Sequence, residues 1–182
     1  MGALKIEDLP RYLYDEFITW EDNWELIYGI PYAMAPAPMI KHQSISNNIA
    51  WELKNKLVDC SKCKALLPIN WKISEDTVVQ PDNSLICHTP SNEAYISKAP
   101  KIIFEILSKS TAKKDTTIKY DLYEKEGVKY YIIVDPESQV AKIYKLFNGK
   151  YVKVDDVSDE VVKFSIEECD LEIDFDFSVI WS

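Results

Sequence analysis

Apolar residues recur at helical spacing in two stretches of the chain. Within residues 40–58 they fall at a strict four-residue step, at Ile45, Ile49, Leu53 and Leu57. This step predicts an amphipathic helix of about four to five turns. A second helix is expected over 111–126, because Ser110 or Thr111 can cap its start and Gly127 suits the residue after its end.

Apolar runs bounded by turn residues predict the strands. Residues 102–107 form a nearly continuous apolar run, which is typical of a central strand covered on both faces. A similar run follows at 129–135, and the expected helix lies between the two. Strand, helix and strand over roughly 30 residues predict a βαβ unit with parallel strands. Shorter strands are expected at 64–68, 70–74, 77–80 and 84–87.

The N-terminal part predicts one or two short helices over 6–20, followed by a β-hairpin. Residues 24–28 and 32–35 are two apolar-rich runs joined by a link that contains glycine. Pro31 places the second run at the edge of a sheet or at a strand start.

The C-terminal part predicts a second hairpin and an alternating tail. Residues 140–146 and 151–154 flank Asn148-Gly149, which is the strongest short hairpin signal in the chain. From 167 to 177 acidic and apolar residues alternate, which predicts a half-exposed strand or a docked extended segment.

Size and charge limit the function. The chain has 182 residues, 47% of them hydrophobic, so we expect one domain over 1–182, with its core at about 10–150 and an acidic C-terminal extension at 155–182. The net charge of −9 argues against a general nucleic-acid coat protein, since phosphate contacts need clustered cations, but it is compatible with a nuclease that has a small basic entrance.

Two further features of the sequence concern location. No apolar run approaches the roughly 20 residues that a membrane helix needs. The N-terminus lacks the apolar core of a signal peptide. We therefore expect a cytoplasmic protein with no membrane partner.

The four cysteines give only a weak metal signal. Cys60 and Cys63 have the CxxC spacing, but a structural zinc site needs a second pair, and Cys87 and His88 are adjacent rather than spaced. A thioredoxin-like redox role is weaker still, because the CxxC does not follow a strand into a βαβ pattern. Free, partly buried thiols are the favoured interpretation, ahead of zinc.

Glu105 is the most informative residue. A carboxylate inside an apolar strand loses its hydration unless a metal ion or a cation partners it. Residue type alone favours a metal ligand and an ion pair with Lys119 or an arginine equally. Asp82 follows Pro81 at a strand end, where a turn aspartate is the commoner case. A neighbouring strand can bring it within ligand distance of Glu105, and such oxygen ligands suit Mg²⁺ or Mn²⁺.

The second helix carries Asp115, Lys119 and Tyr123 at i, i+4 and i+8, so they share one face. One interpretation is a surface Asp–Lys pair, which contributes little. The other sets Lys119 over the carboxylates, where its ammonium group would stabilise a phosphate. Residue spacing by itself favours the surface pair.

Short motifs follow one another in a specific order over roughly residues 10–150. They are Glu25-Leu-Ile-Tyr-Gly29, Met34-Ala-Pro36, His42-Gln43, Gln80-Pro-Asp82, Glu105-Ile-Leu-Ser108, Ser110-Thr111, Asp115, Lys119, Tyr123, Gly127-Val128 and Tyr131-Ile-Ile-Val-Asp135. Together they resemble the Uma2 family, also known as DUF820, a set of restriction endonuclease-like proteins in the PD-(D/E)xK nuclease superfamily.

The resemblance implies an α/β fold, with a restriction endonuclease-like mixed central β-sheet flanked by helices and additional antiparallel hairpins. It implies that Asp82 and Glu105 bind the metal, with Glu25 as a third acidic contributor. The lysine of the superfamily pattern would stand at position 107, where this chain has Leu107. Lys119 is the migrated replacement that we expect to act in catalysis. The supporting residues are His42, Gln80, Asp115 and Tyr123.

The function implied is a metal-dependent endonuclease that hydrolyses nucleic-acid phosphodiester bonds, DNA before RNA, with Mg²⁺ or Mn²⁺. The alternative is a catalytically inactive nuclease-fold module that binds or regulates, which the negative charge and the missing lysine favour. The aromatic content of 12% leaves enough large side chains for the interface of a homodimer or a higher homo-oligomer.

Overall fold

The computed structural model describes residues 9–34, 39–88, 94–108 and 111–182. In chain order the elements are α1 (Tyr14–Phe17), β1 (Trp24–Ile27), β2 (Ile30–Ala33), α2 (Ile40–Lys56), β3 (Lys64–Leu66), β4 (Asn70–Ser74), β5 (Thr77–Val79), β6 (Asn83–Ile86), β7 (Tyr95–Ile96), β8 (Ile102–Ile106), α3 (Ala112–Thr116), α4 (Ile118–Lys125), β9 (Tyr130–Asp135), β10 (Val140–Phe147), β11 (Lys150–Val157), β12 (Val161–Ile166), η2 (Glu167–Cys169), β13 (Leu171–Asp176) and η3 (Phe177–Trp181).

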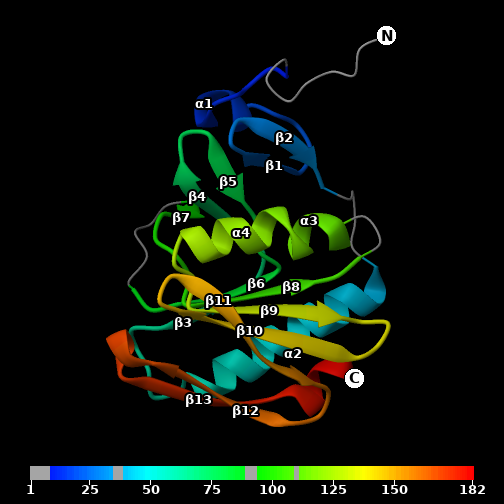
Figure 1. Cartoon of the computed structure of the whole chain (residues 1–182), viewed down its shortest axis with the longest axis vertical. Helices are drawn as coiled ribbons and strands as arrows, with labels where there is room; N and C mark the ends of the chain where they lie inside the picture. Colours follow the sequence, from blue (N-terminus) through cyan, green and yellow to red (C-terminus); the bar gives the residue numbers. More distant parts are fainter. Residues whose placement is uncertain (1–8, 35–38, 89–93, 109–110) are drawn as a thin grey trace.

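The strands form three sheets (Figure 1). A six-stranded sheet has the order β11-β10-β9-β8-β6-β3, a five-stranded sheet the order β2-β1-β5-β4-β7, and β12 and β13 pair alone. In the six-stranded sheet β8 and β9 are parallel, as the βαβ pattern predicts, and the other pairs are antiparallel. The sheet is therefore mixed, and helices flank it.

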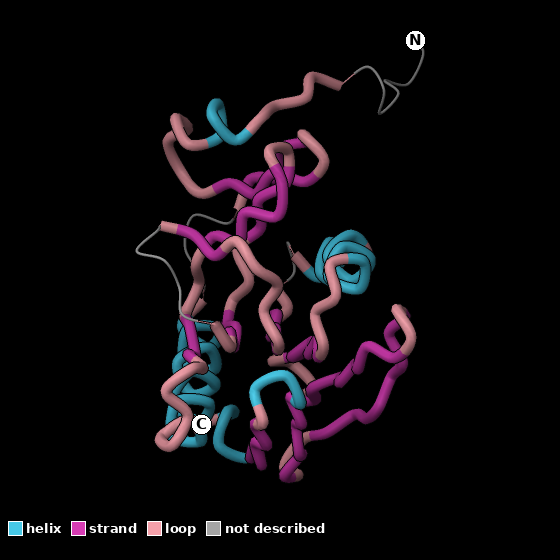
Figure 2. Tube along the Cα trace, turned by 90° about the vertical axis from the view of Figure 1, so that its left-hand side faces the viewer, coloured by secondary structure: helices cyan, strands magenta, loops and turns pink. Residues whose placement is uncertain are grey.

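The central strand β8 separates two apolar cores, because alternate side chains of a strand point to opposite faces. Ile102, Phe104 and Ile106 belong to the core that includes the apolar stripe of α2. Ile103 belongs to the core on the other face, with Leu122 and Tyr123 of α4 and side chains of the five-stranded sheet. Figure 1 shows α4 between the two larger sheets, and Figure 2 shows the same layering from the side.

Both predicted hairpins are confirmed. The two-residue link between β1 and β2 is Tyr28-Gly29, with φ of 52° and 76°, and Asn148-Gly149 joins β10 and β11 with φ of 49° and 77°. Positive φ at both central positions is the turn that matches the twist of a hairpin. At Gly29 a Cβ would also lie 2.9 Å from the Cβ of Arg11, so glycine is required there for space as well.

The expected single helix over 111–126 is wrong. The structure has two helices, α3 and α4, with a break at Thr117, whose φ and ψ are −128° and −80°. The hydroxyls of Thr116 and Thr117 donate to the carbonyls of Ala112 and Lys113, at 2.7 Å and 2.6 Å. Such bonds compete with the helical ladder and account for the break.

Other expectations at the helix ends were only partly met. Thr111 does precede α3, but its hydroxyl contacts Ser108 and makes no capping bond.

At the N-terminus the described residues contain one short helix, α1. Residues 6–8, Pro36 and Ser110 lie outside the described residues. No helix in the described ranges is long and apolar enough to cross a membrane.

Residues 171–176 of the alternating tail form the strand β13, which pairs with β12, whereas its first residues, 167–169, form the short helix η2. Its apolar positions Ile173 and Phe175 are buried in the core under α2, together with Phe164 and Phe177, and its acidic positions face outward. Asn48 of α2 also donates a hydrogen bond to the Ser182 carbonyl, at 2.7 Å. The tail therefore helps to hold α2 against the sheet.

The expectation of four free thiols is wrong for two of them. Cys63 and Cys87 form a disulfide, whereas Cys60 and Cys169 are free. The reason is the pairing of β3 with β6, in which Lys64 opposes Ile86 and the next pair is Cys63 and Cys87. Spacing along the sequence does not reveal this neighbourhood.

Candidate functional site

Three carboxylates and a lysine are buried together between the two larger sheets. Glu25 comes from β1 of the five-stranded sheet, Glu105 from β8 of the six-stranded sheet, and Asp115 and Lys119 from α3 and α4. Their exposed fractions are 0%, 2%, 1% and 2%. A buried charge must be paired with an opposite charge or coordinated by a metal ion, so each of these four groups needs such a partner.

Lys119 is the centre of the cluster. Its Nζ lies 2.8 Å from Oε1 of Glu25, 2.8 Å from Oε1 of Glu105 and 3.8 Å from Oδ1 of Asp115. Burial alone would lower the pKa of Lys119, but the surrounding carboxylates outweigh it and hold the pKa well above its usual value. The side chain is therefore an ammonium ion. Although the helix breaks at Thr117, Lys119 still lies near Asp115.

Glu25 is held by both lysines and by the backbone. The Lys114 ammonium group donates to its Oε2, and the backbone N–H of Gln80 donates to its Oε1 at 2.9 Å. Burial would raise the pKa of Glu25, yet Lys119 and Lys114 outweigh burial and lower it. Glu25 is thus a charged carboxylate shared by Lys119 and Lys114.

Glu105 is the carboxylate that protonates most readily. Lys119 and the hydroxyl of Tyr123 both donate to its Oε1, the latter at 2.7 Å. Burial raises the pKa of Glu105 well above its usual value, the Lys119 charge opposes this, and the charges of Asp115, Asp82 and Glu25 add to it. The pKa of Asp115 is raised as well, because burial outweighs the opposing effect of the Lys119 charge.

Asp82 lies at the more open side of the cluster, with His42. Asn83 opposes Phe104 in the β6–β8 pair, so the next position in this register sets Asp82 opposite Glu105, on the same face. Its Oδ2 accepts a hydrogen bond from the Ile106 backbone at 2.8 Å and lies 3.2 Å from Nε2 of His42. These two side chains are 18% and 17% exposed, so solvent reaches this side.

His42 is a half-buried imidazole beside the Asp82 carboxylate. Burial would lower its pKa, but the hydrogen bond and the charge of Asp82 outweigh burial and raise it. Its Nδ1 is buried without a hydrogen-bond partner among the described residues.

The four supporting residues expected from the sequence contact the cluster in different ways. Asp115 and Tyr123 contact the central groups directly, and His42 contacts Asp82. Gln80 takes part through its backbone N–H, whereas its side chain donates to Asn70 at 3.2 Å.

Sequence reasoning missed two members. One is Lys114, which pairs with Glu25, and the other is Tyr131, whose hydroxyl donates to the Asp115 carbonyl at 2.8 Å. Lys114 directly precedes Asp115 in the sequence, which was the available signal.

The donor set fits a hard divalent cation. Oδ1 of Asp115 is buried without a hydrogen bond among the described residues, although Lys119 lies near it. Lys119 and Tyr123 use the same oxygen of Glu105, and its other oxygen, Oε2, is the one we assign to a metal. Burial, with the charges of Asp82 and Glu25 adding to it, raises the pKa values of Glu105 and Asp115, and a divalent cation would favour their ionised forms.

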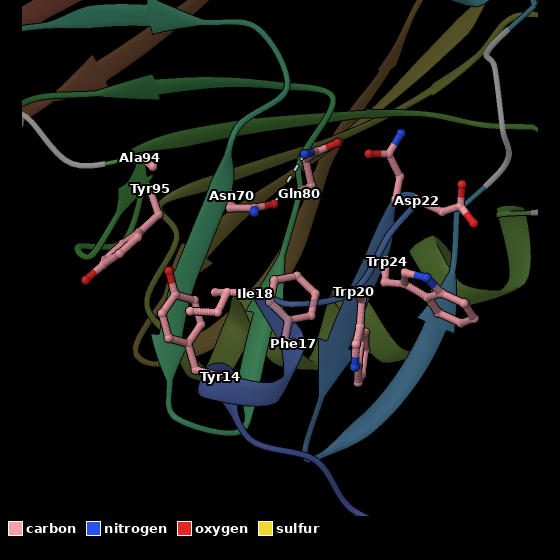
Figure 3. A pocket seen from close by; sticks show the side chains of 11 residues that line it. Tyr14, Phe17, Ile18, Trp20, Asp22, Trp24, Asn70, Gln80, Ala94 and Tyr95 are labelled. Atoms are coloured by element: carbon pink, nitrogen blue, oxygen red, sulfur yellow. Dashed lines mark hydrogen bonds between the residues drawn. The ribbon is translucent and has the colours of Figure 1, made fainter.

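A pocket of about 250 Å³ lies on the face of the five-stranded sheet that is turned away from the cluster, because Trp24 and Glu25 alternate along β1 (Figure 3). Rings of α1, β1, β7 and the intervening loop line it, together with side-chain amides; the main lining residues are Tyr14, Phe17, Trp20, Trp24, Tyr95, Asn23, Asn70 and Gln80. Figure 3 shows the amides of Asn70 and Gln80 joined by a hydrogen bond above the rings. Because the Gln80 backbone bonds Glu25, the pocket and the cluster share a residue.

Comparisons with known proteins agree with this architecture. The model of the Uma2 family, described as "Putative restriction endonuclease", matches residues 14–174. A solved structure described as a putative nuclease belonging to DUF820 from Anabaena variabilis has 18% identity, covers 93% of this chain and 97% of its own, and gives a TM-score of 0.72. This likeness confirms the expected mixed α/β fold.

Another solved structure is less similar. A structure of a DrdV–DNA complex has 16% identity and a TM-score of 0.33, and the match covers 64% of this chain and 12% of that one. No curated protein matches the chain.

Proposed function

Because the chain belongs to the Uma2 family, we propose that it is a nuclease that hydrolyses phosphodiester bonds of nucleic acid with Mg²⁺ or Mn²⁺. One observation carries the proposal: the three buried carboxylates Glu25, Glu105 and Asp115 outnumber the two lysines, Lys114 and Lys119, that contact them. A structural ion pair needs one carboxylate for each lysine. Further buried acids are unfavourable unless a cation joins them.

We assign the cation to Asp82 and Glu105, with Asp115 beside them. Glu25 is also expected as a ligand, but both of its oxygens already accept hydrogen bonds. It would therefore have to release Lys114 or Lys119 to bind a metal, and we assign it to holding Lys119 in place. When bound, the cation supplies a water of lowered pKa and polarises the phosphate.

Lys119 is the group that would stabilise negative charge on the phosphate. Its ammonium group stays charged at neutral pH and is fixed by two hydrogen-bonded carboxylates, so it needs little reorganisation. His42 hydrogen-bonds Asp82 on the side that solvent reaches, and we assign it to orienting that carboxylate.

The aromatic pocket across the five-stranded sheet from the cluster would be a second contact surface for a nucleic-acid substrate. Its tryptophan and tyrosine rings offer faces on which unpaired bases can stack, and its amides can bond base edges. The net charge of −9 limits affinity for a phosphate backbone, so we expect salt-sensitive, weak binding outside this pocket. DNA is the first substrate to test.

A catalytically inactive module on the same fold is the second candidate. The observation in its favour is that Lys119 is held by Glu25 and Glu105, while Leu107 occupies the position of the superfamily lysine. Such a module would still bind a cation and nucleic acid, but it would not turn over.

Cleavage assays separate the two candidates. Single-stranded, double-stranded and branched DNA are incubated with Mn²⁺ and either the wild type, Glu105→Gln or Glu52→Gln. Glu52 is a matched control, since it is a buried glutamate of α2 that lies outside the cluster and accepts a hydrogen bond from the Asp176 backbone N–H. We expect cleavage by the wild type and Glu52→Gln and its loss in Glu105→Gln. Cleavage that persists in Glu105→Gln would indicate a contaminant and contradict the assignment.

A further inference from the structure

All four cysteines of the chain gather at one edge of the six-stranded sheet, although three separate segments supply them. Cys60 and Cys63 bracket the turn between α2 and β3, Cys87 directly follows β6, and Cys169 ends η2. β3 is the last strand of that sheet. The cluster is therefore built by tertiary structure, which spacing along the sequence cannot show.

Three of the four sulfur atoms are close enough to share one ion. One Sγ each from Cys63, Cys87 and Cys169 lie within 4.8 Å of one another. The Cys169 thiol also lies 3.7 Å from the Cys87 carbonyl. Burial raises the pKa of Cys169, and Cys60 is near enough for its charge to add to that shift. A disulfide uses two of these sulfurs and leaves the other two beside it.

The surroundings suit a structural metal. Cys63 is buried, the other three are half-buried, and Cys60, Cys87 and Cys169 pack against the main core. Cys60 and Cys63 have the two-residue spacing of a zinc chelate, and four thiolates form a closed tetrahedral set. Such soft ligands differ from the oxygen ligands near Asp82, so the two sites would select different metals.

We propose that the reduced protein binds Zn²⁺ through Cys63, Cys87 and Cys169, with Cys60 as the fourth ligand, and that the Cys63–Cys87 disulfide is the oxidised form of this site. The ion would fasten the turn after α2, the end of β6 and the β12–β13 hairpin to one another.

An external dithiol can reduce the Cys63–Cys87 disulfide to the two thiols that the metal site needs. The dithiol gives two electrons and two protons to the Cys63–Cys87 bond, which breaks into two thiols, while the dithiol closes to its own disulfide. Zn²⁺ then binds the sulfurs as thiolates and displaces their protons to solvent.

Cobalt titration of the full chain tests the proposal. The chain is reduced with a dithiol, freed of it without oxygen, and titrated with Co²⁺. We expect one equivalent to produce sulfur-to-cobalt charge-transfer absorption and the intense visible bands of tetrahedral Co²⁺, and Zn²⁺ to abolish both. The unreduced chain should show neither, because the disulfide removes two ligands.

Variants assign the signal to this site. Cys169→Ser should lose the charge-transfer absorption, Cys60→Ser should weaken it, and Asp82→Ala should keep it, since that residue belongs to the oxygen site. Absence of the absorption in wild type with four titratable thiols would overturn the proposal. A disulfide that persists in the folded chain after the dithiol, or unchanged spectra in Cys169→Ser, would also overturn it.

Discussion

Lys119 and Glu105 are 14 residues apart in the chain, on a helix and on a central strand, and their Nζ and Oε1 atoms lie 2.8 Å apart inside the protein. The contact links α4 to the six-stranded sheet, and Glu25 extends it to the five-stranded sheet. One ammonium group thus joins the two larger sheets, and its loss would affect both the stability and the proposed chemistry.

Replacing Lys119 with methionine should destabilise the protein strongly. The change keeps the apolar stem but leaves Glu105, Asp115 and Glu25 buried without their shared cation, a loss of about 3–5 kcal/mol for a buried pair. Urea denaturation measures it, and Lys163→Met serves as the control because Lys163 pairs with Glu172 on the surface. Equal midpoints for Lys119→Met and wild type would contradict the central place of Lys119.

Stability without metal should fall as pH rises above 4.5. The folded state raises the pKa of Glu105 from its ordinary value of 4.5, so the folded state holds a proton that the unfolded state has released. The stabilisation is complete below 4.5 and is lost as pH rises toward the folded pKa, with a slope of up to about 1.4 kcal/mol per pH unit. Denaturation with a chelator present, from pH 5 upward, measures the slope.

Glu105→Gln is the comparison for this pH effect, since glutamine cannot ionise. Asp115 and His42, whose pKa values are also raised, remain in the variant and act in the same direction in both proteins. The stability of the variant relative to wild type should therefore increase with pH. A constant difference across the range would show that Glu105 ionises normally.

Mg²⁺ or Mn²⁺ should raise the melting temperature of the wild type. Binding to the folded state alone stabilises it by mass action, about 2.7 kcal/mol when the free ion is at 100 times its dissociation constant. Asp82→Ala should remove the effect, whereas Glu52→Gln should keep it. Identical melting of the wild type with and without metal would count against the site.

Trp20→Ala should weaken binding of single-stranded DNA without abolishing metal stabilisation. A base stacked on an aromatic ring contributes about 1–3 kcal/mol, so affinity should fall roughly 5- to 150-fold if Trp20 carries one base. Trp51→Ala is the matched control, because Trp51 is 57% exposed on α2 and does not line the pocket. Fluorescence anisotropy at fixed salt measures both, and equal losses would place the binding elsewhere.

The sequence predicted what depends on local pattern. The apolar runs of β8 and β9, the stripe of α2 and the Asn148-Gly149 turn all lie within short windows, so the elements they predict are confirmed. The i, i+4 spacing of Asp115 and Lys119 also held across an unexpected helix break, because α4 continues in nearly the same direction after Thr117 (Figure 1).

What the sequence could not predict depends on contacts between distant segments. Lys114 reaches Glu25 across 89 residues, and Cys63 meets Cys87 only because β3 and β6 are neighbours. Gln80 was expected as a supporting residue, and it takes part through its backbone N–H, which bonds Glu25; no side-chain pattern encodes that role. The resemblance to the family supplied Glu25, which lies in a separate sheet from Glu105.

Titration calorimetry with Mn²⁺ tests the central claim most directly, namely that Asp82 and Glu105 share a metal ion. At neutral pH, in two buffers of different ionisation enthalpy, the account predicts binding to wild type with release of protons, since burial raises the pKa of Glu105 and a bound metal favours its ionised form. Glu105→Gln should bind weakly and release fewer protons. No binding to wild type at millimolar Mn²⁺, or equal binding and proton release in both proteins, would contradict it.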